Sequence, residues 1–146
     1  MKKPINILKL EFPAISVNES FARSSVAAFA SQLNPTVDEV DDIKTAVSEA
    51  VTNAIVHGYD DAQDVQMITI KASLFDDHIN IEISDTGKGI RDISMAMQPF
   101  NTTKPSEERA GMGFTVMQSF MDRVEVKSTL GVGTTIVMEK NFNKVA

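Results

Sequence analysis

The chain has 146 residues, a formal charge of −6 and a sequence pI of about 4.8. This length suits one domain with one hydrophobic core, and the acidic balance argues against binding to a nucleic-acid backbone, which needs a basic surface. We therefore expect partners that are proteins, with no direct contact to nucleic acid.

The chain contains no cysteine, which excludes disulfides and thiolate metal sites and is typical of a reducing compartment. Basic residues at the start precede an apolar run, but polar residues (Asn6, Lys9 and Glu11) interrupt it. Neither a signal peptide nor a membrane-spanning helix fits this pattern, so the sequence predicts a soluble cytoplasmic protein without membrane contact. No repeat or linker divides the chain, and we expect one domain over residues 1–146.

The first half is predicted to contain one strand and two helices. Alternating apolar residues predict the strand over residues 5–12. Ser16 with Glu19 has the pattern of a capping box and predicts a helix to about residue 33, with Phe21 on its apolar face. Thr36 with Glu39 forms a second such pattern, ahead of a helix over residues 37–57 that Gly58 ends.

The second half is predicted to hold two strand pairs, separated by an irregular polar segment and a helix. The expected ranges are 68–74 and 79–83 for the first pair, 90–97 for short helical turns, 98–111 for the irregular segment, 113–121 for the helix, and 124–128 and 135–139 for the second pair. The tail from Asn141 is expected to fray. This order predicts an α/β (α+β) two-layer sandwich, in which helices cover one face of a mixed, mostly antiparallel sheet.

The second predicted helix carries a polar stripe beside its apolar face. Glu49, Asn53 and His57 recur at every fourth position, so they share one side of the helix. A carboxamide oxygen can bind a hard cation, while a carboxylate one turn away can accept a proton. The alternative is an amphipathic helix whose polar residues only face water. We expect His57 to be structural.

A glycine-containing segment, Ser-Asp-Thr-Gly-Lys-Gly-Ile at residues 84–90, directly follows the predicted strand 79–83. Glycines let a ligand approach the backbone, and an aspartate at a strand end can accept a hydrogen bond from an amine edge such as that of adenine. The alternative is an ordinary Asp-x-Gly turn, because these residues favour turns for local reasons.

A second glycine pair, Gly111 and Gly113, opens the helix predicted from residue 113. Free N–H groups at a helix N-terminus form an anion site suited to phosphate oxygens. The preceding irregular segment carries hydroxyls and cations that can fold over a triphosphate, or that simply form a solvated basic loop. These residues are Thr102, Thr103, Lys104 and Arg109.

The motifs E-x-x-x-N-A-x-x-H-G, D-x-G-x-G, T-T-K-P and G-x-G-F, in this order, resemble the Bergerat (GHKL) ATP-binding fold of gyrase, Hsp90, MutL and histidine kinases. The resemblance covers nearly the whole chain. The stretches NESFAR and FNTTKP and the short length are most similar to the anti-sigma factor serine kinases of spore-forming bacteria. The resemblance implies an enzyme, an ATP-dependent protein serine/threonine kinase that regulates sporulation transcription.

The same resemblance implies roles for the residues above. Glu49 would be the general base and Asn53 the protein ligand of Mg²⁺, bridging it to the phosphates of ATP. Adenine recognition is implied for Asp85, with Gly87 and Gly89 shaping the pocket and Thr134 or Thr135 supporting the contact. Phosphate binding is implied for the backbone of Gly111 and Gly113 and for the lid residues Thr102, Thr103, Lys104 and Arg109.

Three partners are implied by resemblance: a sigma factor of the sporulation sigma F type, an anti-anti-sigma protein that is phosphorylated on serine, and a second copy in a homodimer. Arg23, on the exposed side of the first helix, is a candidate docking residue.

Two alternative functions stay open. A stress-response anti-sigma kinase would share the whole site, and a nucleotide-gated binding module would hold its sigma factor without phosphate transfer. Glu49 favours a kinase, because binding alone needs no base. A complete histidine kinase is not expected, since His57 and His78 are the only histidines and neither lies on a dimerisation helix ahead of the ATP site. The second domain that gyrase and MutL use is not expected either, because little chain follows the last strand.

Overall fold

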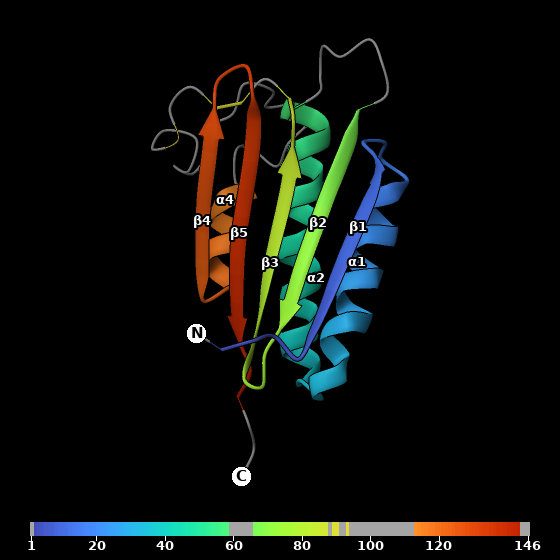
Figure 1. The fold of residues 1–146 in the computed structure, drawn as a ribbon, viewed down its shortest axis with the longest axis vertical. Coiled ribbons are helices and arrows are strands. Elements are labelled where there is room, and N and C mark those ends of the chain that lie inside the picture. The colour runs from blue at the N-terminus through green and yellow to red at the C-terminus, as the bar shows by residue number, and fades with distance from the viewer. Residues whose placement is uncertain (1, 59–65, 88, 91–92, 94–112, 144–146) are drawn as a thin grey trace.

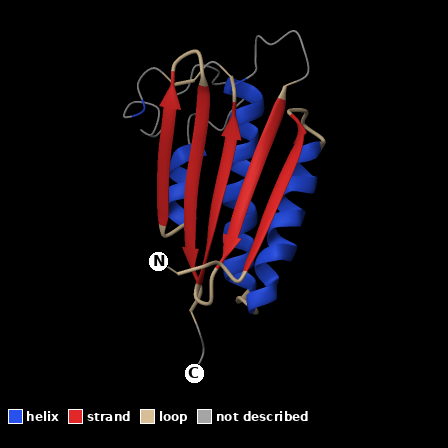
Figure 2. Cartoon of the chain, in the orientation of Figure 1, coloured by secondary structure: helices blue, strands red, loops and turns tan. Residues whose placement is uncertain are grey.

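The structure is a computed structural model and describes residues 2–58, 66–87, 89–90, 93 and 113–143. In these residues one sheet is covered on one face by helices (Figures 1 and 2). The strands are β1 (Asn6–Pro13), β2 (Met67–Leu74), β3 (His78–Asp85), β4 (Arg123–Thr129) and β5 (Gly133–Asn141). The α-helices are α1 (Asn18–Ala30), α2 (Val37–Asn53) and α4 (Gly113–Phe120).

The sheet has the strand order β1-β2-β3-β5-β4, and each of these four pairings is antiparallel. The predicted strand pairs and the predicted two-layer fold are confirmed, whereas the prediction of a mixed sheet is wrong, because all pairings among the described strands are antiparallel. Alternate side chains of β2 and β3 are buried beneath the helices, as expected for an antiparallel sheet with one solvated face. No helix in the described part of the chain is long and apolar enough to cross a membrane.

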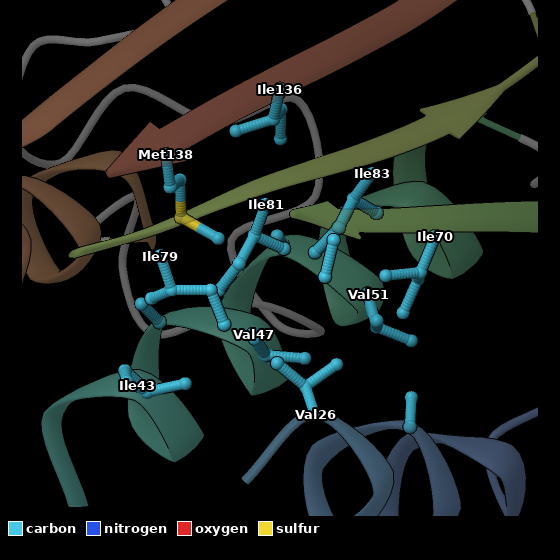
Figure 3. Packing of buried hydrophobic residues seen from close by; sticks show 14 of the residues in the cluster. Val26, Ile43, Val47, Val51, Ile70, Ile79, Ile81, Ile83, Ile136 and Met138 are labelled. Carbon is cyan, nitrogen blue, oxygen red and sulfur yellow. The ribbon is translucent and has the colours of Figure 1, made fainter. Parts of the chain in front are cut away.

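The hydrophobic core lies between α2 and the centre of the sheet (Figure 3). Val47 of α2 is fully buried, as are the inward-facing Ile81 of β3 and Met138 of β5. Burying one such side chain contributes about 1.5–3 kcal/mol, so this contact fixes the rotation of α2 about its own axis. The neighbouring positions on α2, including Glu49 and Asn53, are thereby held in defined places.

The capping box predicted for Ser16 and Glu19 is wrong. Helix α1 begins at Asn18, and its N-cap residue Val17 makes no side-chain cap. The backbone N–H of Glu19 donates to the carbonyl of Ser16, while the Glu19 carboxylate accepts from the Ser48 hydroxyl of α2. A contact between two helices has replaced the local cap, which the sequence pattern of one segment cannot reveal.

Phe21 does not share the burial of the apolar face on which it was predicted to lie. Its side chain is 53% exposed and makes an edge-to-face contact with Phe12, with ring centroids 6.5 Å apart. Helix α1 packs against α2, and its buried residues are Ala22, Val26, Ala27, Phe29 and Ala30. Phe21 lies at the margin of this contact, beside strand β1. The predicted first helix otherwise holds, since α1 is followed by a 3₁₀ turn over Ser31–Leu33.

The second capping box is confirmed, because Thr36 and Glu39 exchange both hydrogen bonds. Helix α2 ends at Asn53, and the chain continues as a π-helical turn over Ala54–Gly58. The helical run therefore reaches Gly58 as predicted, but its last turn is wider than an α-helix. Single π-helical turns occur frequently at functional sites.

The predicted fraying of the tail is wrong for Phe142 and Asn143. Phe142 is buried, and the backbone N–H of Asn143 donates to Oε2 of Glu39 at 2.7 Å. On the preceding strand, Lys140 binds Asp42 of α2 at 2.9 Å and the carbonyl of Phe120 at 2.8 Å. The C-terminal end of β5 and the residues after it are therefore bound to the helices by polar contacts.

Candidate functional site

The predicted site residues on α2, β3 and β5 lie toward one end of the described part of the molecule. The C-terminal ends of α2, β3 and β4 and the start of β5 lie there, at the top of Figure 1. Antiparallel pairing of β3 with β5 places Asp85 opposite Thr134, and pairing of β4 with β5 places Ser128 on the other side of Thr134. The fold thus brings together residues that are about fifty positions apart in the sequence.

Glu49 and Asn53 are buried one turn apart on α2, with 4% and 8% of their surfaces exposed. The predicted alternative, a polar stripe that only faces water, is therefore excluded for these two residues. The side-chain oxygen and nitrogen of Asn53 have no hydrogen-bond partner among the described residues. Leaving such a buried group unpaired costs about 1–3 kcal/mol, so the amide of Asn53 is available to pair with a ligand.

The continuation of the stripe to His57 is interrupted in the backbone. The π-helical turn begins at Ala54, directly after Asn53, so the four-residue spacing of an α-helix does not carry on to His57. The side chain of His57 lies outside what the structure describes.

Asp85 ends strand β3, and its carboxylate accepts hydrogen bonds from two backbone N–H groups. Gly87 donates to Oδ1 at 2.9 Å, and Thr134 donates from the neighbouring strand. Burial raises the pKa of Asp85 above its ordinary value, although these two hydrogen bonds act in the opposite direction. The Gly87 contact is the local turn expected for Asp-x-Gly, whereas the Thr134 contact joins that turn to the sheet.

Two glycines allow the turn after β3 to lie against the β4–β5 hairpin. A Cβ on Gly89 would come within 2.4 Å of the Thr129 carbonyl oxygen, and one on Gly133 within 2.2 Å of the Asp85 carbonyl oxygen. Both glycines have positive φ, +79° and +144°. Any side chain at either position would separate the two loops. Gly133 is not among the site residues predicted from sequence.

The neighbouring threonines, which the sequence leaves as alternatives, lie on opposite faces of the sheet. Thr134 is buried beside Asp85 with 9% exposure, and its hydroxyl is 2.8 Å from that of Ser128. Thr135 pairs instead with Ser84, with their hydroxyl oxygens 3.0 Å apart. The geometry thus selects Thr134 as the hydroxyl next to Asp85.

Ser128 is a second residue that the sequence-based predictions miss. Its hydroxyl contacts Ile90, Gly133 and Thr134. It occupies a position that follows the alternation of Val124 and Val126 on β4, which pack against the core. A polar residue at an inward position of an alternating strand is a weak signal that could have singled it out.

A groove of about 560 Å³ lies between α1 and α2 and reaches Glu49. Arg23 lines its α1 side, and the Arg23 guanidinium is 3.4 Å from the Glu19 carboxylate. Its α2 side includes Lys44 and Ser48. The groove therefore joins the predicted docking residue to the predicted base.

The predicted phosphate site is described only in part. Gly113 is the first residue of α4 and is buried, in agreement with the predicted start of that helix. The remaining predicted phosphate-binding residues (Thr102, Thr103, Lys104, Arg109 and Gly111) lie outside the described residues.

The chain matches the family model for a histidine kinase-like ATPase domain over residues 12–140. It is 58% identical over 139 residues to an anti-sigma F factor of Caldanaerobacter subterraneus subsp. tengcongensis, covering 95% of this chain and 96% of the relative. It is 52% identical over 141 residues to an anti-sigma F factor of Clostridium beijerinckii, covering 97% and 98% of the two chains. The chain belongs to the anti-sigma F factor family. The histidine kinase-like ATPase match also shows that its domain binds ATP.

Solved structures share the fold of this family member at low sequence identity. The RsbU and RsbW domains of a Mycobacterium tuberculosis protein match with a TM-score of 0.72 and 20% identity, over 98% of this chain and 34% of that one. A histidine kinase domain from Erythrobacter litoralis matches with a TM-score of 0.58 and 14% identity, over 90% and 62% of the two chains. The predicted Bergerat fold is thereby confirmed.

Proposed function

We propose that this anti-sigma F family member is an ATP-dependent serine protein kinase that also holds a sigma factor of the sporulation sigma F type. The observation that carries the proposal is the pair of buried polar side chains on α2, Glu49 and the unpaired Asn53. A binding module needs the ATP pocket, but it has no need of a buried carboxylate one helical turn from the cation ligand.

Glu49 is the proposed general base. Its carboxylate is nearly inaccessible but lines the groove between α1 and α2, through which a protein serine can approach. In this role it accepts the proton of the attacking hydroxyl as the phosphoryl group is transferred, a contribution of about 10²- to 10⁴-fold in rate.

Asn53 is the proposed protein ligand of Mg²⁺. Its amide oxygen is buried and unpaired, and oxygen is the ligand atom that Mg²⁺ prefers. Mg²⁺ usually takes only one or two protein ligands together with phosphate oxygens and waters, so a single amide fits such a site. The bound ion would neutralise charge on the phosphates of ATP.

Asp85 and Thr134 are proposed to recognise adenine. The Asp85 carboxylate can accept a hydrogen bond from the adenine amino group, and the buried Thr134 hydroxyl lies beside it. Gly87 and Gly89 shape the turn around the base. The backbone N–H groups at Gly111 and Gly113 and the side chains of Thr102, Thr103, Lys104 and Arg109 are proposed to hold the phosphates.

The proposed acceptor is an anti-anti-sigma protein, phosphorylated on serine, which docks near Arg23. Phosphorylation would release the kinase to hold its sigma factor inactive. A homodimer is part of the proposal, by analogy with the family. A cytoplasmic location is also part of it, because a bacterial sigma factor works there with RNA polymerase.

The test is transfer of labelled phosphate from γ-labelled ATP with Mg²⁺ to proteins of a spore-forming bacterium, followed by mass spectrometry of the labelled protein. We expect a single labelled serine on one small acceptor. Glu49→Gln should lower the rate of labelling by about 10²- to 10⁴-fold, while calorimetry shows unchanged ATP affinity. Transfer at the wild-type rate by Glu49→Gln would refute the base assignment. Tight ATP binding without any transfer by the wild type would favour a nucleotide-gated binding module instead.

A further inference from the structure

Three polar side chains lie in a line across three neighbouring strands, at the end of the sheet where β3 ends and β5 begins. Asp85 of β3 pairs in register with Thr134 of β5, which pairs with Ser128 of β4. The row continues the inward-facing positions of these strands, where the next residue of β5 on the same face is the buried Ile136. Polar residues on the core-facing side of a sheet need partners, and these three are linked to one another.

The contacts of the Ser128 hydroxyl fix the direction of its hydrogen bonds. Its oxygen is 2.7 Å from the nitrogen of Ile90, 3.1 Å from the carbonyl oxygen of Gly133 and 2.8 Å from Oγ1 of Thr134. A hydroxyl has one proton and two acceptor positions. The Ile90 N–H can only donate, and the Gly133 carbonyl can only accept. Ser128 therefore donates to Gly133, and its second acceptor position is left for the proton of Thr134.

This arrangement commits the only proton of Thr134 to Ser128. The Thr134 oxygen can then present only acceptor capacity to a ligand. Asp85 also acts as an acceptor, because its carboxylate receives the N–H groups of Gly87 and Thr134. The two side chains beside each other are thus both acceptors, and neither offers a donor.

We propose that Ser128 is a positioning residue that holds the Thr134 hydroxyl as an acceptor and so makes the site prefer a purine with a 6-amino group over one with a 6-keto group. Adenine presents an amino donor at this position, whereas guanine and hypoxanthine present a carbonyl acceptor. The inference rests on the proposed recognition of adenine by Asp85 and Thr134. Two acceptors facing a keto oxygen leave polar groups unpaired, which is how polar sites reject the wrong substrate.

A purely structural role for Ser128 makes a different prediction. Its contact with Ile90 also ties the turn after β3 to strand β4. Loosening that turn would weaken every purine nucleotide to a similar extent. Releasing the proton of Thr134 would instead change the affinity for an amino purine and a keto purine unequally, so the ratio of the two affinities separates the two roles.

The experiment measures the Kd of ATP and of inosine triphosphate by calorimetry, with Mg²⁺, for the wild type and Ser128→Ala. In Ser128→Ala the Thr134 hydroxyl can turn and donate to a keto oxygen. We expect the preference for ATP over inosine triphosphate to fall by about 10-fold. Ser128→Thr keeps the hydroxyl and should retain the preference. If Ser128→Ala does not fold, Ser128→Cys replaces the hydroxyl by a weakly bonding thiol of similar size, with the same expected fall.

The chain offers a matched control in the Ser84–Thr135 pair, which is also a serine–threonine contact across two strands but on the other face of the sheet. Ser84→Ala should leave the preference unchanged. In a Thr134→Val background, Ser128→Ala should change the preference no further, because the hydroxyl that it orients is gone.

Equal weakening of both nucleotides by Ser128→Ala would overturn the proposal and leave Ser128 a structural residue. An equal loss of preference in Ser84→Ala would also overturn it. Asp85→Ala tests the proposed base site separately and should strongly weaken ATP binding. Unchanged ATP affinity in that variant would overturn both the base site and this inference, whereas an unchanged ratio in Ser128→Ala alone overturns only the inference.

Discussion

Gly133 lies so close to the backbone of Asp85 that no side chain fits between them. A Cβ on Gly133 would be 2.2 Å from the Asp85 carbonyl oxygen and 2.8 Å from Cα of Thr86. We expect Gly133→Ala to destabilise the protein by about 2–5 kcal/mol, from overpacking and from a backbone angle that alanine avoids, and to weaken ATP binding by at least about 10-fold. Thermal unfolding and calorimetry measure the two effects.

Gly131 in the same hairpin turn is the matched control. Its φ of +81° also disfavours alanine, but nothing lies within 4 Å of the added Cβ. Gly131→Ala should cost only about 1–2 kcal/mol from backbone strain and leave ATP affinity unchanged. Equal ATP affinities for the two variants would show that the contact of Gly133 with Asp85 does not shape the nucleotide site.

The sequence alone could predict most of the fold, because its signals are local. Alternation along β2 and β3 and the capping box at Thr36 each act within a few residues, and the structure confirms them. The motif residues Glu49 and Asn53 could likewise be singled out by their spacing. Their burial could not be inferred from that spacing, since a solvated stripe has the same pattern.

The sequence-based predictions fail where a contact with a residue distant in the chain replaces a local one. Glu19 has the pattern of a cap, but its carboxylate binds Ser48, which is 29 residues away in the chain. The backbone of Asn143 binds Glu39, across 104 residues, so the tail does not fray there. Ser128 has no motif of its own, and its role becomes visible only when three strands are aligned in register. Long-range pairing of this kind cannot be read from the periodicity of one segment.

Asn53→Ala tests the cation ligand. We expect it to weaken Mg²⁺-ATP binding by about 10-fold or more, because the proposed oxygen ligand is lost. In the ligand-free protein the same change should alter stability by less than about 1 kcal/mol, since removing an unpaired buried amide offsets the cavity that it leaves. Calorimetry in the presence and absence of Mg²⁺ and thermal unfolding check both expectations.

Asn18 is the matched control for Asn53, because its side-chain amide is hydrogen-bonded: its nitrogen donates to the carbonyl of Pro13 at 3.0 Å. Asn18→Ala should lower stability by about 1 kcal/mol and leave Mg²⁺-ATP affinity at the wild-type value. If Asn53→Ala bound Mg²⁺-ATP as tightly as Asn18→Ala does, Asn53 would not be the ligand.

The lowered pKa of Glu39 makes the stability of the folded protein depend on pH. Burial acts to raise the pKa of Glu39, but hydrogen bonds with Thr36 and with the backbone of Asn143, together with the charge of Lys140, outweigh it, so the pKa lies below its ordinary value of 4.5. The folded state therefore binds this proton less readily than the unfolded chain. The contribution of Glu39 is fully present above about pH 4.5 and is lost as the pH falls through the lower pKa of the folded state.

Glu39→Gln should lower the free energy of unfolding by about 1–2 kcal/mol at neutral pH. The carboxylate accepts one N–H on each oxygen, whereas glutamine has one oxygen and would point its amide nitrogen at the other donor. The deficit should shrink below about pH 4.5. Glu125→Gln, on a glutamate paired with the exposed Arg123, should cost less than about 0.5 kcal/mol. A deficit for Glu39→Gln that persisted unchanged at low pH would show that the ionised carboxylate of Glu39 does not stabilise the fold through Thr36 and Asn143.

Arg23 tests whether the groove between α1 and α2 receives the acceptor protein. Its guanidinium is held by Glu19 and by the Ser20 hydroxyl, and it lines the same groove as Glu49. Arg23→Ala should raise the KM for the protein acceptor by about 10-fold, because a charged contact at an interface is lost, while ATP affinity stays unchanged. Arg123→Ala removes a more exposed arginine from β4 that is also paired with a glutamate and lies outside the residues that line the groove, and it should leave both constants unchanged. Steady-state transfer to the isolated acceptor separates the outcomes. A loss of ATP affinity in Arg23→Ala would mean that Arg23 acts through the nucleotide site, and equal KM values for the two variants would place the acceptor on another surface.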